Sequence, residues 1–184
     1  MKYLSRGCCH TEGDRHLVSR GGRSFILGPD LYALWEAGRG TPQEVPARYE
    51  AAVKRMEQAG IIVLSTESGP LADYQMLCRC ILCPDGTQSA RLLWSGIDRR
   101  VWKWLHRASL RLTASELVRL EEQHLRPSRN LLCSDGRQEL TELIYDPGTI
   151  PDGVLEQRME LSPARDATVA SLLRLLRCGY LLLI

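Results

Sequence analysis

Apolar residues recur with helical spacing near the end of each half of the chain, and in both places a glycine and an apolar run follow. The first stretch is AVKRMEQAGIIVL, residues 52–64, with its glycine at Gly60. The second is VASLLRLLRCGYLLLI, residues 169–184, with its glycine at Gly179. Glycine readily adopts the left-handed conformation that ends many helices. Each stretch therefore predicts a helix that ends at glycine and is followed by a buried strand.

Before the first of these endings, short apolar runs predict strands and capped segments predict helices. The strands are expected at Lys2–Cys9, Arg15–Ser19, Ser24–Leu27 and, after the last helix, Ile61–Leu64. The helices are expected to begin at Pro29, at Thr41 and near Pro46. Thr41 and Glu44 have the spacing of a capping box, in which each side chain accepts a backbone hydrogen bond at the start of the helix. Residues 1–65 thus predict a small sheet packed against three helices.

The second half repeats this order and adds an insertion. Its expected elements are strands at Tyr74–Cys83 and Ala90–Trp94, a helix over 98–108, and a capping box at Thr113 and Glu116. Between this helix and the last one, residues 123–162 predict a β-hairpin that turns at Asp135-Gly136. We therefore predict an α+β fold of two tandem winged-helix-like units, residues 1–68 and residues 69–184, the second carrying the hairpin insertion.

The first unit resembles the PqqD-like peptide-recognition family over SFILGPDLYALWEAGRGTPQEVPARYEAAVKRMEQAGIIVL. Members typically show a strand, a helix with a Leu-Trp pair, a glycine-rich turn, a Thr-x-x-Glu motif, and a third helix that ends in glycine and apolar residues. Here these features are Phe25–Leu27, Leu34-Trp35, Gly38–Gly40, Thr41–Glu44 and Gly60–Ile62. All of them are packing or capping motifs.

The resemblance implies that the chain binds the leader of a ribosomally made precursor peptide. In that family the peptide adds to a sheet edge as an extra strand, beside the third helix, so main-chain hydrogen bonds supply affinity. The implied binding residues are Ser24, Phe25, Ile26 and Leu27 on the edge strand, and Ala51, Lys54, Arg55 and Gln58 on the helix. Phe25 and Leu27 share one face of a strand, which is also the pattern of core residues.

The tandem architecture further resembles the stand-alone partner subunits of multinuclear iron oxidases, as in methanobactin and 3-thiaglutamate biosynthesis. In those systems the small subunit delivers a cysteine-containing peptide to the iron enzyme. The resemblance implies a non-catalytic subunit of a heterodimer. It would hold no cofactor of its own, and any iron would belong to the partner enzyme.

A basic stretch in the second half predicts the surface for that partner. DRRVWKWLHRASLR contains the candidate partner-binding residues Arg99, Arg100, Trp102, Lys103, His106 and Arg107. Trp102 lies outside the apolar stripe of its predicted helix, and an exposed tryptophan among arginines is typical of an interface hot spot. The alternative is a solvated helix whose long side chains cover apolar surface.

The main alternative function is that of a DNA-associated winged-helix regulator or chromosome-organising accessory protein. Winged helices that bind DNA need a basic third helix to neutralise phosphates. Here that helix carries Lys54 and Arg55 together with Glu50 and Glu57, and the net charge of the chain is only +2. This mixture makes nucleic acid an unfavoured partner.

The cysteines raise a third possibility, a metal or thiol sensor. CRCILC places Cys78, Cys80 and Cys83 close together, but only the last two have the spacing of a zinc knuckle. If Tyr74–Cys83 is a strand, Cys78 and Cys80 share a buried face, where free cysteine acts as a small apolar residue. We therefore predict no metal site.

Neither catalysis nor a membrane is indicated by the sequence. It contains no phosphate-binding loop, paired-histidine motif or Gly-x-Ser-x-Gly elbow. It also lacks an apolar stretch long enough to span a bilayer and an apolar N-terminal signal, and its odd number of cysteines does not form a disulfide framework. We expect a cytoplasmic protein.

Overall fold

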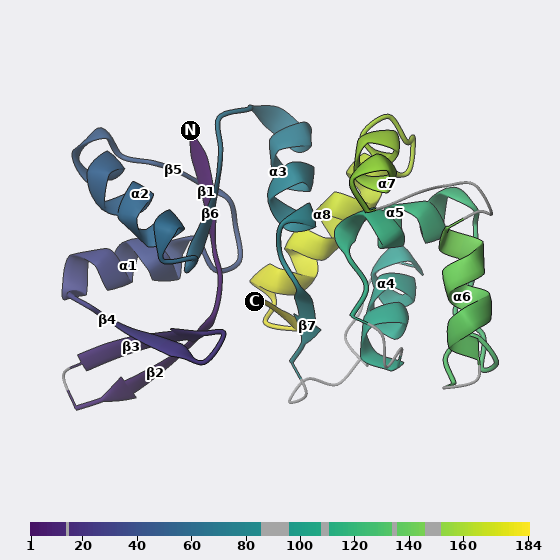
Figure 1. The fold of residues 1–184 in the computed structure, drawn as a ribbon, viewed down its shortest axis with the longest axis horizontal. Helices are drawn as coiled ribbons and strands as arrows, with labels where there is room; N and C mark the ends of the chain where they lie inside the picture. The colour runs from purple at the N-terminus through teal and green to yellow at the C-terminus, as the bar shows by residue number, and fades with distance from the viewer. Residues whose placement is uncertain (14, 86–95, 108–110, 134–135, 146–151) are drawn as a thin grey trace.

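The computed structural model describes residues 1–13, 15–85, 96–107, 111–133, 136–145 and 152–184 (Figure 1). The strands are β1 (Lys2–Ser5), β2 (Cys8–Glu12), β3 (Arg15–Arg20), β4 (Arg23–Leu27), β5 (Gln43–Glu44), β6 (Ile62–Ser65), β7 (Leu82–Pro84) and β8 (Leu181–Leu183). The helices are α1 (Pro29–Ala37), the 3-10 turn η1 (Ala47–Tyr49), α2 (Glu50–Gln58), α3 (Gly69–Cys78), α4 (Gly96–Arg107), α5 (Ala114–Glu122), α6 (Arg137–Ile144), α7 (Asp152–Met159) and α8 (Arg165–Arg177). The protein is mixed α+β with small antiparallel sheets, which confirms the predicted class.

The sheet β5-β1-β6 lies between two hydrophobic cores. Side chains of a strand alternate between its faces. Tyr3 and Leu64, which are register partners, belong to the first core, which they share with α1 and α2. Their neighbours Leu4 and Val63 belong to the second core, which they share with α3 and α8. Figure 1 shows β1 and β6 standing between these two groups of helices. One short sheet thus joins the two halves by burying both of its faces.

The second sheet is the meander β2-β3-β4, which lies below α1 in Figure 1. Val18, in its central strand, is fully buried and packs in the first core. The strand expected over Lys2–Cys9 is divided at Arg6 and Gly7, so that β1 joins the sheet between the cores and β2 begins the meander. The division places the edge strand β4 beside helix α2.

The second half is built mainly from helices packed around α8. Asp98, at the first turn of α4, is 1% exposed and accepts hydrogen bonds from Ser171 Oγ at 2.6 Å and from Arg174 Nη2 at 2.9 Å. Both partners lie on α8, so these bonds fasten α4 to it. The short strand β8, which follows α8 in the chain, pairs with β7.

The prediction of a strand over Tyr74–Cys83 is wrong, because half of that segment belongs to helix α3. Pro70 stands in the first turn of this helix, a position that suits proline. The helix packs against β6, α5 and α8, and its buried residues do not form a single stripe. Because the helix has no single apolar stripe, its sequence shows instead the alternation of Tyr74, Met76 and Cys78, which is typical of a strand. Only its last part, Leu82 onward, is extended.

The helix expected to start at Thr41 is also wrong. Gln43 and Glu44 form β5 and pair with Tyr3 and Lys2 of β1. The capping-box spacing is therefore present without a helix, because β1 offers backbone partners that a local motif does not reveal. Part of the segment expected near Pro46 is a single 3-10 turn that leads into α2. The described first half consequently has two α-helices where three were predicted.

The expected hairpin in the insertion is replaced by helices α6 and α7. Leu140 and Ile144 are spaced i, i+4 on α6, and both are buried in the second core. Asp135 of the proposed turn lies outside the described residues, as does the strand proposed at Ala90–Trp94. The boundary between units at residue 68 stays a prediction.

Candidate functional site

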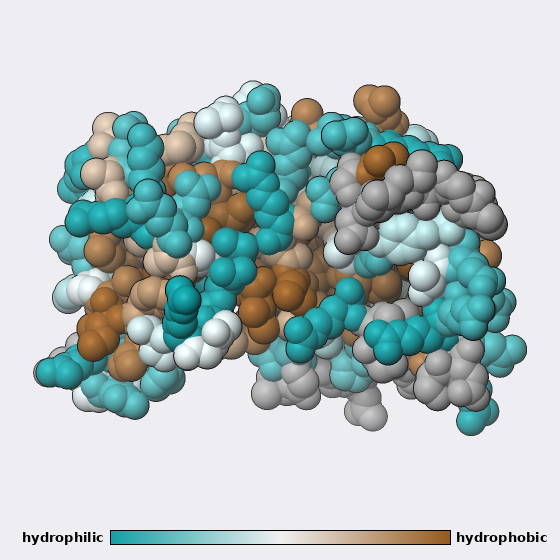
Figure 2. Space-filling view, in the orientation of Figure 1, coloured by the Kyte–Doolittle hydropathy of each residue, from teal (hydrophilic) through white to brown (hydrophobic). Residues whose placement is uncertain are grey.

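A groove runs between the edge strand β4 and helix α2. Its volume is about 530 Å³. It is lined by Ser24, Phe25, Ile26, Leu27, Leu31, Ala52, Arg55, Met56, Ala59 and Ile61. Figure 2 shows hydrophobic residues at the surface where β4 meets α1, at the left of the view. The structure therefore brings the four predicted edge residues together with Arg55 of the predicted helix.

The hairpin register shows which main-chain groups of β4 face away from β3. Gly21 and Gly22, at the turn, have φ values of 57° and 78°, the signature of a type I′ turn. In such a hairpin the pair that closes the turn, Arg20 and Arg23, exchanges hydrogen bonds, and the next pair does not. The N–H and C=O groups of Ser24 and Ile26 consequently point away from β3.

A side-chain contact supports this register. Non-hydrogen-bonded pairs bring their side chains closest together. Ser19 and Ser24 are such a pair, and their Oγ atoms lie 2.8 Å apart. Among the described strands, β4 pairs only with β3, so its outer edge is open. This edge can accept another strand.

The side chains of β4 divide between the core and the surface. Leu27 is 8% exposed and belongs to the first core, which confirms the core role considered for at least one of the two residues; Phe25 is partly buried and packs against that core. Ile26 faces the other way and is 64% exposed. An added strand would therefore meet free main-chain groups next to an uncovered apolar side chain.

On α2 the predicted groove border is only partly right. Lys54 and Gln58 line a separate hollow of about 510 Å³, and Ala51 is exposed but lines neither hollow. The groove is instead bordered by residues that the prediction missed, Ala52, Met56 and Ala59. Their i, i+4, i+7 spacing is the signal that could have found them, since it continues the apolar stripe to the open edge.

The expected exposure of Trp102 is wrong. Trp102 is only 2% exposed, stacks on His106 at 4.9 Å and meets Tyr180 edge-on at 5.4 Å. It is buried because α4 packs against both α8 and β7, which covers more of the helix than one stripe. Arg100 is also engaged, since its Nε atom donates to Glu121 at 3.0 Å.

Other residues of the predicted partner surface do face outward. Arg99, Lys103 and His106 are exposed, whereas the side chain of Arg107 lies outside the described residues. The hot-spot argument for this face is lost with the burial of Trp102. Partner binding through the remaining cations stays a prediction.

The cysteines of CRCILC do not lie along one strand: Cys78 ends α3, Cys80 lies between α3 and β7, and Cys83 is in β7. Burial raises the pKa of Cys78 to about 12 and that of Cys80 to about 11. Both thiols are therefore protonated at neutral pH, which disfavours them as nucleophiles and metal ligands. In the described part of the chain, no group of three or more His, Cys, Asp or Glu residues is arranged to hold a metal ion.

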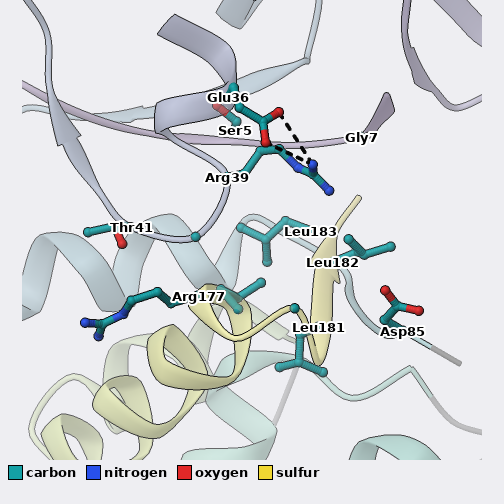
Figure 3. A pocket seen from close by; sticks show the side chains of 13 residues that line it. Ser5, Gly7, Glu36, Arg39, Thr41, Asp85, Arg177, Leu181, Leu182 and Leu183 are labelled. Atoms are coloured by element: carbon teal, nitrogen blue, oxygen red, sulfur yellow. Dashed lines mark hydrogen bonds and ion pairs between the residues drawn. The ribbon is translucent and has the colours of Figure 1, made fainter. Parts of the chain in front are cut away.

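A second cleft, of about 380 Å³, lies between the two halves along the edge of β8 (Figure 3). Leu181, Leu182 and Leu183 form one wall, and the Glu36–Arg39 ion pair lies opposite. The edge of β8 is already in use, because the Gly7 N–H donates to the Leu183 carbonyl at 2.7 Å. The edge of β8 is therefore less available to an added strand than the edge of β4.

Comparisons with protein-family models, with curated proteins and with solved structures each find no match to this chain. Within the described residues, none of the helices has the length and apolar character needed to cross a membrane.

Proposed function

We propose that the chain is a non-catalytic recognition subunit that binds the leader of a ribosomally made precursor peptide as a strand added to β4. The observation that carries this proposal is the open edge of β4 beside an apolar groove on α2. Backbone groups of Ser24 and Ile26 would pair with the peptide, and the groove would receive its side chains. This arrangement is the one that the winged-helix resemblance implies.

In this proposal the second half serves a modifying enzyme, which forms a heterodimer with the chain and holds any iron. The exposed cations of α4, Arg99 and Lys103, would contact the enzyme. The two functions would lie on different parts of the molecule, since the groove is lined by residues of β4, α1 and α2 and of the turn between α2 and β6. A peptide and an enzyme could then be bound together.

The charges of α2 favour a peptide over DNA. If α2 entered a groove of DNA, its exposed side chains would meet phosphates. Lys54 and Arg55 are exposed on α2, but so are Glu50 and Glu57. Two carboxylates on the contacting helix would cancel much of the attraction, whereas main-chain pairing at a sheet edge does not depend on net charge.

The decisive experiment replaces Ile26 with proline. The proposal expects genes for a short cysteine-rich peptide and a modifying enzyme beside the gene for this chain, and these two products are the ligands to test. Ile26→Pro removes one outward N–H, and proline is tolerated at a strand edge. We expect at least a tenfold weaker peptide affinity by calorimetry, because about 1.4 kcal/mol corresponds to tenfold and the ring also obstructs pairing.

Ile26→Thr is the matched control, because it keeps the N–H and the β-branched shape, and it should bind nearly as well as the parent chain. Circular dichroism would verify that both variants are folded. The proposal fails if neither peptide nor enzyme binds at micromolar concentration, or if the proline variant binds as tightly as the threonine variant. Retention of duplex DNA in a salt-sensitive shift assay would instead support the DNA-associated alternative.

A further inference from the structure

Two arginine side chains cover the outer edge of β6. Arg6 donates from Nη2 to the carbonyl of Ile62 at 3.2 Å, and Arg79 donates from Nη1 to the carbonyl of Leu64 at 3.2 Å. The two arginines are also linked directly, since Arg6 Nη1 donates to the Arg79 carbonyl at 2.9 Å. Two cationic groups from different elements are thereby held next to each other.

The side chain of a third arginine, Arg20 at the end of β3, lies close enough to Arg6 for the two charges to interact. Its guanidinium lies against Gly60, where an added Cβ atom would collide with Nη1. Burial lowers the pKa of Arg6, and the charges of Arg20 and Arg79 lower it further, while Cys80 and Glu57 oppose them. Arg6, Arg20 and Arg79 are called the arginine cluster below.

The electrostatic cost of holding the three arginines together is only partly compensated. No carboxylate in the described part of the chain lies within 4.0 Å of any of its guanidinium nitrogens. The Nε atoms of Arg6 and Arg20 are buried without a hydrogen-bond acceptor. Like charges held together destabilise a fold, and buried donors without acceptors add to the cost. An anion placed among the three groups would offset both terms.

The cluster adjoins the groove between β4 and α2. Ile61 lines the groove, and its carbonyl accepts the N–H of Arg6 at 2.8 Å. On the other wall, Ser24 lines the groove and follows Arg23, the register partner of Arg20. A strand added to β4 would therefore leave the groove at its Ser24 end next to the cluster.

We propose that the arginine cluster binds the carboxylate of an acidic residue in the peptide that is added to β4. This inference rests on the proposed function and names a feature of the peptide. Guanidinium groups pair well with carboxylates, often through two hydrogen bonds. The lining of the groove contains Arg55 but no acidic residue, whereas the hollow that Arg79 lines also contains Glu57 and Glu67. A single compact cluster with Glu57 nearby suits one carboxylate better than the continuous phosphates of DNA.

The test uses two synthetic probes, a short blocked peptide that alternates leucine with glutamate and the same peptide with glutamine in place of glutamate. Tryptophan fluorescence, to which Trp35 contributes with the three other tryptophans, offers a readout, because the Nε1 atom of Trp35 donates to the carbonyls of Arg6 and Ile61. We expect the glutamate peptide to bind about tenfold more tightly. Arg20→Gln and Arg79→Gln should each remove most of that preference.

Arg15→Gln is the matched control. Arg15 is exposed at the opposite end of β3, and its replacement removes the same charge. Equal affinity for the two peptides, or equal losses in the Arg15 and Arg20 variants, would overturn the inference. Arginine-dependent binding of duplex DNA in place of the glutamate peptide would overturn it as well.

A further measurement separates this inference from the proposed function. Sodium acetate, added at constant ionic strength, supplies a carboxylate without a strand. It should shift the Nε–Hε NMR signals of Arg6 and Arg20 and leave that of Arg15 in place. If acetate shifts them but no peptide binds, the cluster is an anion site and the β-augmentation proposal fails. If acetate shifts none of them, the carboxylate site is wrong, whatever the peptides do.

Discussion

The two helix ends before β6 and β8 are built alike, although the parts of the molecule around them differ. At each end a glycine with positive φ, 80° at Gly60 and 73° at Gly179, follows the helix. After α2, the Gly60 N–H donates to the Glu57 carbonyl at 2.8 Å and the Ile61 N–H to the Met56 carbonyl at 3.0 Å. After α8, the Gly179 N–H donates to the Leu176 carbonyl at 3.0 Å and the Tyr180 N–H to the Leu175 carbonyl at 2.9 Å. These bonds are the two pairs of a Schellman motif.

The two endings differ in what surrounds the strand that follows. β6 is buried on both faces between the two cores, and its outer carbonyls receive the side chains of Arg6 and Arg79. β8 is anchored through its helix, because α8 is fastened to α4 by Asp98, and its outer edge, where Leu183 accepts the N–H of Gly7, borders the cleft of Figure 3. A short local motif therefore produces the same turn twice, while distant residues decide how each turn is supported.

The largest expected effect on stability comes from removing Asp98, which fastens α8 to α4 and has no counterpart at the first helix end. Asp98→Ala would leave Ser171 and Arg174 without their buried acceptor, which should lower the free energy of unfolding by about 3 kcal/mol. Asp166→Ala is the control, since Asp166 is an exposed carboxylate on α8 paired with Arg165. It should cost less than about 0.5 kcal/mol. Urea unfolding measures both, and similar losses would show that the buried acceptor is not what holds α8.

The next effect compares the two glycines directly. Alanine is strained at positive φ, so Gly179→Ala should cost about 1 kcal/mol of stability, since its added Cβ atom meets nothing within 4 Å. Gly60→Ala should cost more, about 2 kcal/mol, because its Cβ atom also displaces the Arg20 guanidinium from the arginine cluster. Thermal unfolding of both variants measures the difference. A greater loss at Gly179 would contradict this account of the Gly60 turn.

What could be predicted from the sequence is what local residues determine. The glycine-terminated helices α2 and α8 were predicted, and so was the capping box of α5. There Thr113 accepts from the Glu116 N–H at 3.3 Å, and the Glu116 carboxylate accepts from the Thr113 N–H at 2.6 Å. The same motif at Thr41 failed because a distant strand, β1, paired with Gln43 and Glu44. Long-range pairing thus overrode a local preference.

The candidate site divides in the same way. The strand Ser24–Leu27 could be predicted because its apolar residues and the glycine turn before it are local, whereas its edge position was implied only by the family resemblance. The arginine cluster could not, since Arg6 lies between β1 and β2, Arg20 ends β3 and Arg79 follows α3, and the three meet only in the folded chain. Trp102 was misplaced for a similar reason, because Tyr180, which helps to bury it, lies at the far end of the sequence.

The smallest expected effect concerns a third helix end, which has the same hydrogen bonds without glycine. After α5, His124 has a φ of 54°, its N–H donates to Glu121 at 3.0 Å, and the Leu125 N–H donates to Leu120 at 3.0 Å. His124 is exposed, so its side chain contributes little packing to offset the left-handed strain. His124→Gly should raise the free energy of unfolding by about 0.5 kcal/mol, the strain relieved less the entropy that glycine adds to the unfolded chain. His124→Ala keeps the strain and should give no gain, so a melting temperature raised equally in both variants would point to the lost imidazole instead of the backbone.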